Sequence, residues 1–318
     1  MLTCAQQITL YIFLAIVLTL IFCYVLVCHQ VVNMPNLILG KISQRFSNPC
    51  DIQFPLVYRE AVYIPKTNGV YEQKLAIALT DVAYMTSNAN CQEILPIENP
   101  PGFSQQLRIE GIEPVSGEKV MLAYIFWNQF SRQVIISFTG TEAKCLWKAN
   151  GRYQQVAPTM LNGYKDGVLI HSGFYDVYMA IRSQLWDFWN ENSSWVEILY
   201  LTGHSLGGAL SSICAFDFAE VFKNSSPIHY SMGGPRVGNV LFCETFRQRI
   251  PTSLIVVNMD DIVPNLPLAV MFDYMYSSLD QNVPFTVNLG SIVDNHNSSY
   301  YYNLPICPEA AACNIDEK

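Results

Sequence analysis

Charged residues are scarce in this sequence. Only 14% of its 318 residues are Asp, Glu, Lys or Arg, and the 26 acidic residues outnumber the 18 basic ones. No stretch is rich in Lys or Arg, and the first basic residue is Lys41. Because binding to a nucleic-acid backbone needs clustered positive charge, nucleic acid is excluded as a partner. The apolar fraction of 51% excludes wholesale disorder and predicts a folded core.

Metal-ligand patterns are also absent. The chain has ten Cys and five His, but no Cys-x-x-Cys pair and no His/Cys cluster has the spacing of a zinc site. We therefore expect no structural metal. Cys4, Cys23 and Cys28 belong to the N-terminal segment, which leaves an odd number of Cys and an open disulfide pairing.

The N-terminal segment lacks charge, glycine and proline. Residues Ile8–Cys28 are almost wholly apolar, and a helix of this length, at ~1.5 Å per residue, spans the ~30 Å hydrocarbon core of a bilayer. A cleaved signal peptide would have a shorter apolar region preceded by Lys or Arg. We therefore predict an N-terminal transmembrane helix as an uncleaved anchor in residues 1–28, a stalk with the first strands in residues 29–70, and a folded domain in residues 71–318.

Two patterns of apolar residues follow each other in the folded domain. The first part has one helical pattern and three strand-like runs separated by turns, which favours antiparallel pairing. The second part alternates short apolar strands with helices, which is typical of parallel strands covered on both faces. We therefore predict an α/β sandwich with a mostly parallel central sheet. The expected strands are Leu107–Ile112, Val120–Phe126, Gln133–Phe138, Val196–Leu201, Ile228–Met232 and Leu254–Asn258, and the expected helices are Glu72–Met85, Phe174–Trp189 and Leu206–Phe222.

One Gly-x-Ser-x-Gly motif stands between an expected strand and an expected helix. It reads Gly203-His204-Ser205-Leu206-Gly207. A turn this tight puts the serine in a strained backbone conformation, and side chains at positions 203 and 207 would collide. The serine hydroxyl then projects from the sheet edge beside the free N–H groups of the helix start. The motif therefore predicts a nucleophilic Ser205.

The region around this motif resembles the class 3 lipases, the fungal triacylglycerol lipase type of the α/β-hydrolase superfamily. The resemblance covers about residues 70 to 305 in consistent order and implies the α/β-hydrolase fold. The segments that carry it are Ile198–Leu210, Ile136–Thr141, His171–Phe174, Gly233–Asn239 and Asp261–Pro264.

The order of the triad in α/β-hydrolases assigns the acid and the base. The nucleophile is followed along the chain by a carboxylate and then by a histidine. His296 is the one histidine beyond both, and we expect it on a polar loop; His229 precedes the acid and lies on a strand. Asp260 and Asp261 both follow the strand that should carry the acid. The resemblance selects Asp261, and Asp260 stays open as the alternative.

The resemblance also implies the groups that stabilise the oxyanion. Thr141, in the loop after the third strand, and Leu206 would each donate a backbone N–H. His171 is expected to be structural because the triad already has its base. A triad of this kind needs no metal and no organic cofactor.

The segment Glu142–Gly167 occupies the position of the lid in the family. Leu146 and Trp147 lie among polar residues there, so a short amphipathic lid could meet a lipid surface. A packed surface turn is the alternative.

The function that these residues imply is a membrane-anchored serine lipase or esterase. It would hydrolyse acylglycerol esters at a membrane or emulsion interface through an acyl-enzyme. A phospholipase A-type acyl hydrolase and a non-catalytic membrane-anchored binding module are the alternatives. Lys41 and Arg45 after the apolar segment favour a cytosolic domain, whereas the many secreted members of the family favour the extracellular face. The headgroup, the acyl chain and the oligomeric state stay open.

Overall fold

The computed structural model describes residues 73–92, 97–141, 144–222, 227–280, 282–303 and 314–315. All of them belong to the second of two compact units, Phe54–Lys318. The expected membrane span at residues 8–28 and the expected stalk at residues 29–70 lie outside the described residues. Within the described ranges, no helix combines the length and the apolar character that a membrane crossing requires.

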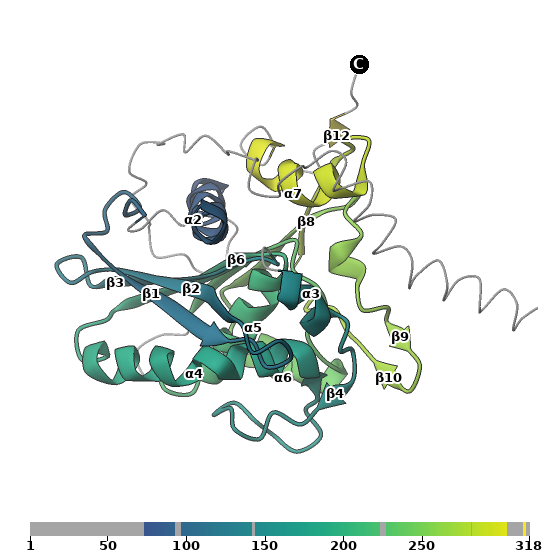
Figure 1. Ribbon diagram of the computed structural model, residues 1–318, viewed down its shortest axis with the longest axis horizontal. Helices are drawn as coiled ribbons and strands as arrows, with labels where there is room; N and C mark the ends of the chain where they lie inside the picture. The colour runs from purple at the N-terminus through teal and green to yellow at the C-terminus, as the bar shows by residue number, and fades with distance from the viewer. Residues whose placement is uncertain are drawn as a thin grey trace, which may run out of the picture. The chain divides into compact units, whose positions relative to one another are not determined.

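A mixed sheet forms the centre of this unit (Figure 1). Its described strands lie in the order β1-β2-β3-β6-β7-β8-β11-β12. β1, β2 and β3 pair antiparallel, and every pair from β3 onward is parallel. The strands are β1 (Gln105–Ile112), β2 (Lys119–Asn128), β3 (Gln133–Phe138), β6 (Ile198–His204), β7 (Ile228–Met232), β8 (Ser253–Asn258), β11 (Asn282–Val287) and β12 (Asn314–Ile315).

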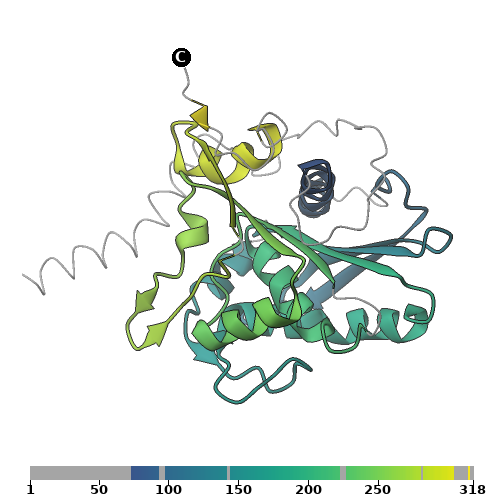
Figure 2. The same ribbon diagram turned by 180° about the vertical axis from the view of Figure 1, so that it is seen from behind.

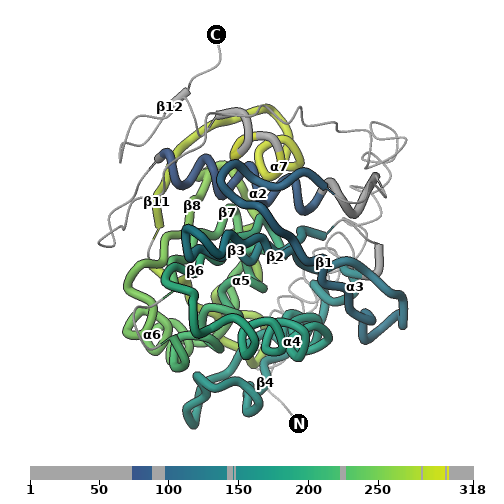
Figure 3. Tube along the Cα trace, turned by 90° about the vertical axis from the view of Figure 1, so that its left-hand side faces the viewer, coloured from purple at the N-terminus to yellow at the C-terminus, as the bar shows by residue number. Residues whose placement is uncertain are grey.

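Helices cover both faces of the sheet, as the apolar strands require. In Figures 1 and 2, α2 and α7 lie on one side of it and α4, α5 and α6 on the other, and Figure 3 shows the same layers from the side. Each face has its own apolar core, one including side chains of α2 and α7 and one including side chains of α3 to α6. The helices are α2 (Gln73–Gln92), α3 (Lys144–Asn150), α4 (Ser172–Asn192), α5 (Leu206–Phe218), α6 (Val240–Arg249) and α7 (Ile292–Asn303).

The expected α/β sandwich with a mostly parallel sheet is confirmed. All six expected strands are present, with ends that differ by a few residues. The helix expected to end at Phe222 ends at Phe218, and the helix expected to end at Met85 continues to Gln92. Helices α6 and α7 and strand β11 were not expected. The smaller elements are β4 (Gln155–Val156) paired with β5 (Ile170–His171), β9 (Val270–Met271) paired with β10 (Tyr274–Met275), and the 3-10 turn Val263–Asn265.

Candidate active site

Ser205 occupies the sharp turn between β6 and α5. Its backbone has φ 57° and ψ −127°, in the left-handed half of conformational space that a residue with a Cβ rarely adopts. The Ser205 N–H donates to the carbonyl of Met232 at the end of β7, 3.0 Å away. This bond to the neighbouring strand holds the strained turn in place, and strain maintained in this way is typical of functional sites.

Close packing around the turn explains both of its glycines. A Cβ on Gly203 would lie 2.3 Å from the carbonyl carbon of Gly207. A Cβ on Gly207 would lie 2.3 Å from the carbonyl oxygen of Phe138 at the end of β3. Neither distance leaves room for a side chain, so the collision predicted from the motif has a direct counterpart in the structure.

The first turn of α5 points free N–H groups at the region around Ser205. Ser205 is the N-cap residue, but its side chain makes no capping hydrogen bond to the helix. The first N–H groups of an α-helix have no partner within the helix. Leu206 is the first residue of α5, so its N–H belongs to this set. An anion beside Ser205 would meet the positive end of the helix dipole.

Thr141 lies just beyond the end of β3, which neighbours β6 in the sheet. The register pairs Phe138 with Gly203, so the loop that follows β3 emerges beside the Ser205 turn. Gly140 N–H donates to Ser87 Oγ at 2.9 Å, and the Thr141 hydroxyl accepts from the Asn150 side chain at 3.0 Å. These bonds hold the loop, and the Thr141 hydroxyl is already engaged by Asn150.

His296 and Asp261 are in direct contact. His296 Nδ1 lies 2.8 Å from Asp261 Oδ2, and the Asp261 side chain is completely buried. The neighbouring Asp260 side chain is exposed and makes no contact with the imidazole. Of the two carboxylates that the sequence left open, Asp261 therefore lies against the histidine. The expectation that His296 lies on a polar loop is wrong, because His296 lies on helix α7.

The Asp261 carboxylate accepts two further hydrogen bonds. Tyr300, one helical turn after His296 on α7, donates its hydroxyl to Asp261 Oδ2 at 2.8 Å. The Val263 N–H donates to Oδ1 at 2.9 Å. With three donors around it, the buried carboxylate is held in one orientation and its charge is compensated.

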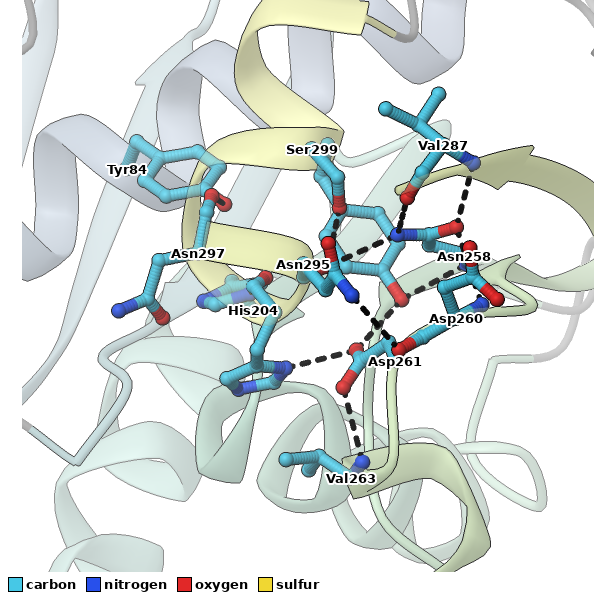
Figure 4. A network of polar contacts seen from close by, with 12 residues as sticks. Tyr84, His204, Asn258, Asp260, Asp261, Val263, Val287, Asn295, Asn297 and Ser299 are labelled. Carbon is cyan, nitrogen blue, oxygen red and sulfur yellow. Dashed lines mark hydrogen bonds and ion pairs between the residues drawn. The ribbon is translucent and has the colours of Figure 1, made fainter. Parts of the chain in front are cut away.

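Two asparagines tie the strands and the helix that carry these groups together (Figure 4). The Asn258 side chain bonds to both the N–H and the carbonyl of Val287 at 2.9 Å, which joins β8 to β11. It also donates to the carbonyl of Asn295 on α7 at 3.1 Å. The Asn295 side chain donates to the carbonyl of Asp260 at 3.2 Å. The position of α7, and of His296 with it, is therefore fixed to the strand end that carries Asp261.

His204 connects the Ser205 turn to α7. Its Nε2 donates to the carbonyl of His296 at 2.9 Å, and the centroids of the two rings are 4.6 Å apart. Tyr84 of α2 also stacks on His204, with the two ring centroids 4.9 Å apart. Burial and the proximity of His296 lower the pKa of His204 well below 6.5. His204 is thus a neutral support between Ser205 and His296.

Nε2 of His296 is buried and makes no hydrogen bond within the described part of the chain. Its other nitrogen is fixed by Asp261, so Nε2 is the nitrogen available to a reacting group. Ser205 adjoins His204, which contacts His296. A serine hydroxyl, an imidazole with a free nitrogen and a buried carboxylate form the set needed for nucleophilic catalysis.

The other two histidines after residue 170 are packed away from this cluster. His229 on β7 contacts Ser211 at 2.9 Å and Ser253 at 2.8 Å, and burial lowers its pKa to about 3. His171 caps α4, where its Nδ1 accepts from the Phe174 N–H at 3.2 Å, and burial lowers its pKa to about 3 as well. These contacts fit structural roles for both.

Leu146 does not present an apolar face to solvent. It lies in α3, is completely buried and belongs to the core on the α4 and α5 side of the sheet. Burial in the core already covers its apolar surface, and the lid at this position stays a prediction. Trp147 also lies in α3, but its side chain is outside what the structure describes.

Several supporting residues escaped the sequence reasoning. Tyr300 and Asn295 were missed because α7 was read as a loop, which hides their spacing from His296. The signal for the helix is present as Ser291-x-x-Asp294, a capping-box pattern. In the structure the Asp294 N–H donates to Ser291 Oγ at 3.0 Å. No local signal identifies Asn258, whose partners lie about 30 residues further along the chain.

The described residues contain no group of three or more His, Cys, Asp or Glu side chains that could hold a metal ion.

Comparison with known proteins gives one family. Residues 135–271 match the family model for lipase (class 3). Lipase ZK262.3 of Caenorhabditis elegans is 44% identical over 206 residues, which cover 62% of this chain and 55% of that protein. Phospholipase A(1) DAD1, chloroplastic, of Arabidopsis thaliana is 35% identical over 156 residues, which cover 44% of this chain and 35% of that protein. The matched regions thus span only part of the length of these relatives.

Solved structures share the fold. The triacylglyceride lipase of Rhizomucor miehei has a TM-score of 0.53 at 22% identity, covering 69% of this chain and 83% of that one. A fungal lipase–inhibitor complex has a TM-score of 0.54 at 21% identity, covering 74% and 97%. The α/β-hydrolase fold is therefore confirmed, and residues 135–271 of the chain are similar to the class 3 lipase family.

Proposed function

We propose that this protein is a serine carboxylic ester hydrolase that acts on acylglycerols through an acyl-enzyme. The single observation that carries the proposal is the arrangement of Ser205 in a strained turn, linked through His204 to a His296 whose Nδ1 is bound by buried Asp261. Neither the strain at Ser205 nor the free Nε2 of His296 contributes to stability. Both are what a nucleophile and its general base require.

The reaction starts with Ser205. Its Oγ attacks the ester carbonyl carbon while His296 Nε2 takes the hydroxyl proton, and Asp261 stabilises the imidazolium that results. The N–H groups of Leu206 and Thr141 stabilise the negative charge on the carbonyl oxygen. His296 then returns the proton to the departing alcohol, which leaves the acyl group on Ser205. Water then attacks the acyl carbonyl carbon while His296 takes a proton from it. The bond between the acyl carbon and Ser205 Oγ breaks, His296 returns the proton to Oγ, and the carboxylic acid leaves.

Acylglycerols are the first choice of substrate. A Rhizomucor miehei lipase is 31% identical over half of this chain, and a mono- and diacylglycerol lipase of Fusarium solani is 26% identical over 49% of it. The phospholipase A(1) of Arabidopsis thaliana, 35% identical, supports the phospholipase A-type alternative. The same Ser205 chemistry serves both classes, because only the alcohol that leaves differs.

We also propose that residues 8–28 anchor the domain to a membrane. The proposal rests on the uncharged apolar run at Ile8–Cys28. An anchored hydrolase would work at a lipid surface, where its substrates collect. The side of the membrane would follow from protease protection of the full chain in sealed vesicles.

The test of the function uses the full chain in detergent micelles. Hydrolysis would be measured on a short-chain p-nitrophenyl ester, emulsified triacylglycerol, monoacylglycerol and phosphatidylcholine vesicles, with Ser205→Ala as the blank. We expect turnover that Ser205→Ala abolishes, and the relative rates would rank the headgroups. A folded wild-type chain that neither hydrolyses these esters nor reacts with a fluorophosphonate would leave the non-catalytic binding module as the better interpretation.

A matched pair of substitutions tests the acid. Asp261→Asn should lower kcat by about 10⁴-fold, because the amide cannot hold the imidazole in the required state. Asp260→Asn changes the adjacent, exposed carboxylate in the same way and should leave kcat unchanged. Equal losses in the two variants would contradict the assignment of Asp261.

A further inference from the structure

Helix α2 reaches the active-site edge of the sheet from the face opposite to α5. Its residue Ser87 is 3% exposed, and the hydroxyl oxygen of Ser87 accepts the N–H of Gly140 at 2.9 Å. Gly140 directly precedes Thr141, whose N–H is one of the two donors in the proposed reaction. Ser87 lies before the segment 135–271 that matches the lipase family model, and it belongs to none of the motifs that carry the resemblance.

The glycine before Thr141 leaves the direction of the Thr141 N–H open. Glycine has no Cβ, so its φ and ψ range more widely than those of any other residue. The N–H groups of Gly140 and Thr141 are separated only by the φ and ψ of Gly140. A donor stabilises the oxyanion only when it lies about 2.7–3.1 Å from that oxygen. Contacts from outside the loop must therefore fix an orientation that the glycine backbone does not fix itself.

The peptide group between Thr139 and Gly140 is held at both of its ends. A Cβ on Gly207 would lie 2.8 Å from the carbonyl oxygen of Thr139, so this carbonyl lies close to the first turn of α5. The N–H at the other end of the same peptide group is bonded to Ser87 of α2. The carbonyl and the N–H of a trans peptide point in opposite directions. The peptide group therefore lies between α5 and α2, and contacts with both helices set its tilt.

Ser87 is a fixed acceptor because α2 is itself tied to the site. Tyr84, one turn earlier on α2, donates its hydroxyl to the carbonyl of Asn297 on α7 (Figure 4). Thr86 donates its hydroxyl to Ser137 Oγ on β3 at 2.9 Å. The helix is thus bonded to the element that carries the candidate base and to the strand that leads into the loop.

The contact with Ser87 controls the loop more directly than the contacts on the strand side do. Thr139 is already tied to β2, since its N–H donates to the carbonyl of Leu122 at 3.0 Å and its hydroxyl to that of Met121 at 3.3 Å. Gly140 is buried, so without Ser87 its N–H would lose its acceptor. A glycine peptide group can then rotate to find another one. The residue that follows, Thr141, would move with it.

We propose that Ser87 is a positioning residue for the oxyanion site. Its hydroxyl fixes the Gly140 peptide group, and through it the position of the Thr141 N–H relative to the N–H of Leu206. The proposal rests on the proposed function, in which both N–H groups stabilise the same oxygen. The negative charge on that oxygen forms only during the reaction, so Ser87 should affect kcat and leave KM little changed.

The experiment compares two neighbouring hydroxyl groups of α2 in the full chain. Ser87→Ala removes the acceptor of the Gly140 N–H. Thr86→Val is the matched control, because the Thr86 hydroxyl is also buried and bonds α2 to β3 but not to the loop. Ser87→Thr keeps a hydroxyl at position 87. Each variant is assayed for kcat and KM on a short-chain p-nitrophenyl ester in detergent micelles, and its unfolding by urea is recorded.

We expect Ser87→Ala to lower kcat by about 10- to 100-fold, the size of effect that follows from misplacing one of two oxyanion donors. KM should change little. Thr86→Val should keep the wild-type kcat, and Ser87→Thr should restore most of the rate that Ser87→Ala loses. Equal kcat in Ser87→Ala and Thr86→Val would overturn the proposal, and so would a loss in Ser87→Ala that appears only in KM.

Inhibition by butylboronic acid gives a second readout that needs no turnover. Its boron accepts a lone pair of Ser205 Oγ, the hydroxyl proton passes to His296, and the tetrahedral adduct carries a negative charge as the oxyanion intermediate does. The inhibition constant should rise in Ser87→Ala and stay unchanged in Thr86→Val. The pH midpoint of kcat/KM, which reports the base, should be the same in all variants. A midpoint shifted in Ser87→Ala alone would place the effect on His296 and overturn the proposal.

Failure of the proposed function would look different. The wild-type chain would then neither hydrolyse the ester nor bind the boronic acid. Hydrogen exchange still tests the loop in that case, because the amides of residues 139–141 should exchange faster in Ser87→Ala than in Thr86→Val or wild type. Faster exchange without hydrolysis would retain the hold of Ser87 on the loop and remove the enzyme. Equal exchange in the three chains would overturn that hold as well.

Discussion

The hydroxyl of Tyr300 is expected to position the candidate acid, and Tyr300→Phe isolates it. The hydroxyl donates to Asp261 Oδ2 at 2.8 Å and accepts from the Asn258 N–H at 3.0 Å. Burial and the nearby Asp261 charge raise the pKa of Tyr300 well above 10, so it remains a donor at any working pH. Phenylalanine keeps the ring and removes both bonds.

The size of the effect follows from the two bonds. A hydrogen bond to a charged group contributes about 1.5–3 kcal/mol, and the buried Asn258 N–H would lose its partner at a cost of about 1–3 kcal/mol. Taken together, the two losses should lower the free energy of unfolding by about 2.5–6 kcal/mol. If half or more of the bond to Asp261 supports the transition state, kcat should fall by about tenfold. KM should change little, because Tyr300 lies behind Asp261 and does not face the substrate.

Tyr124→Phe is the matched control. Tyr124 is buried in the same apolar core as Tyr300, and its hydroxyl has no hydrogen-bond partner among the described residues. Removing that hydroxyl should leave kcat unchanged and should not lower the free energy of unfolding. Both variants would be assayed for kcat and KM on a soluble ester and for urea-induced unfolding. Equal kcat in Tyr300→Phe, Tyr124→Phe and wild type would refute the positioning role of Tyr300.

Three further predictions concern packing, charge and pH. Gly207→Ala puts a Cβ 2.3 Å from the Phe138 carbonyl oxygen, so β3 and α5 must separate; we expect a loss of about 1–3 kcal/mol in urea unfolding and reduced kcat. Asp217→Asn removes a fully buried carboxylate that is paired with an arginine, which should cost about 3–5 kcal/mol in the same assay, whereas Asp280→Asn at an exposed ion pair should cost under about 1 kcal/mol. His229 has its pKa lowered to about 3 by burial, so the unfolded chain binds one more proton between pH 6.5 and 3. Stability is therefore full above pH 6.5 and should fall by up to about 1.4 kcal/mol per pH unit below it, and a flat unfolding free energy between pH 7 and 4 would contradict this.

Local sequence patterns made the Ser205 turn and the neighbouring strands predictable. The glycines at 203 and 207 are required by close contacts of the turn with itself and with the end of β3. The apolar runs of β6, β7 and β8 indicate strands that are buried on both faces of the sheet. Each signal is confined to about ten residues of sequence. The expected strands were therefore found to within a few residues, and Ser205 was assigned to its turn without a structure.

Helix α7 could not be predicted from the same kind of signal. Its sequence, Ile292–Asn303, is rich in Asn, Ser and Tyr, which have modest helix propensity. Its stability comes from tertiary contacts, including Tyr300 in the core and the Asn295 side chain that accepts from the Leu289 N–H at 2.6 Å. A polar sequence that depends on its neighbours for helix formation is easily taken for a loop.

The role of His204 was equally hidden, because the motif fixes only the glycines and the serine around it. Its imidazole fills the space between the Ser205 turn and α7, and its Nε2–H holds the carbonyl of His296. The lowered pKa of His204 matters for the proposed reaction, in which His296 becomes an imidazolium. A second positive charge with ring centroids 4.6 Å apart would oppose that step, whereas a neutral His204 does not. Burial of this residue thus gives the turn a rigid support for the general base without an electrostatic cost to the proton transfer.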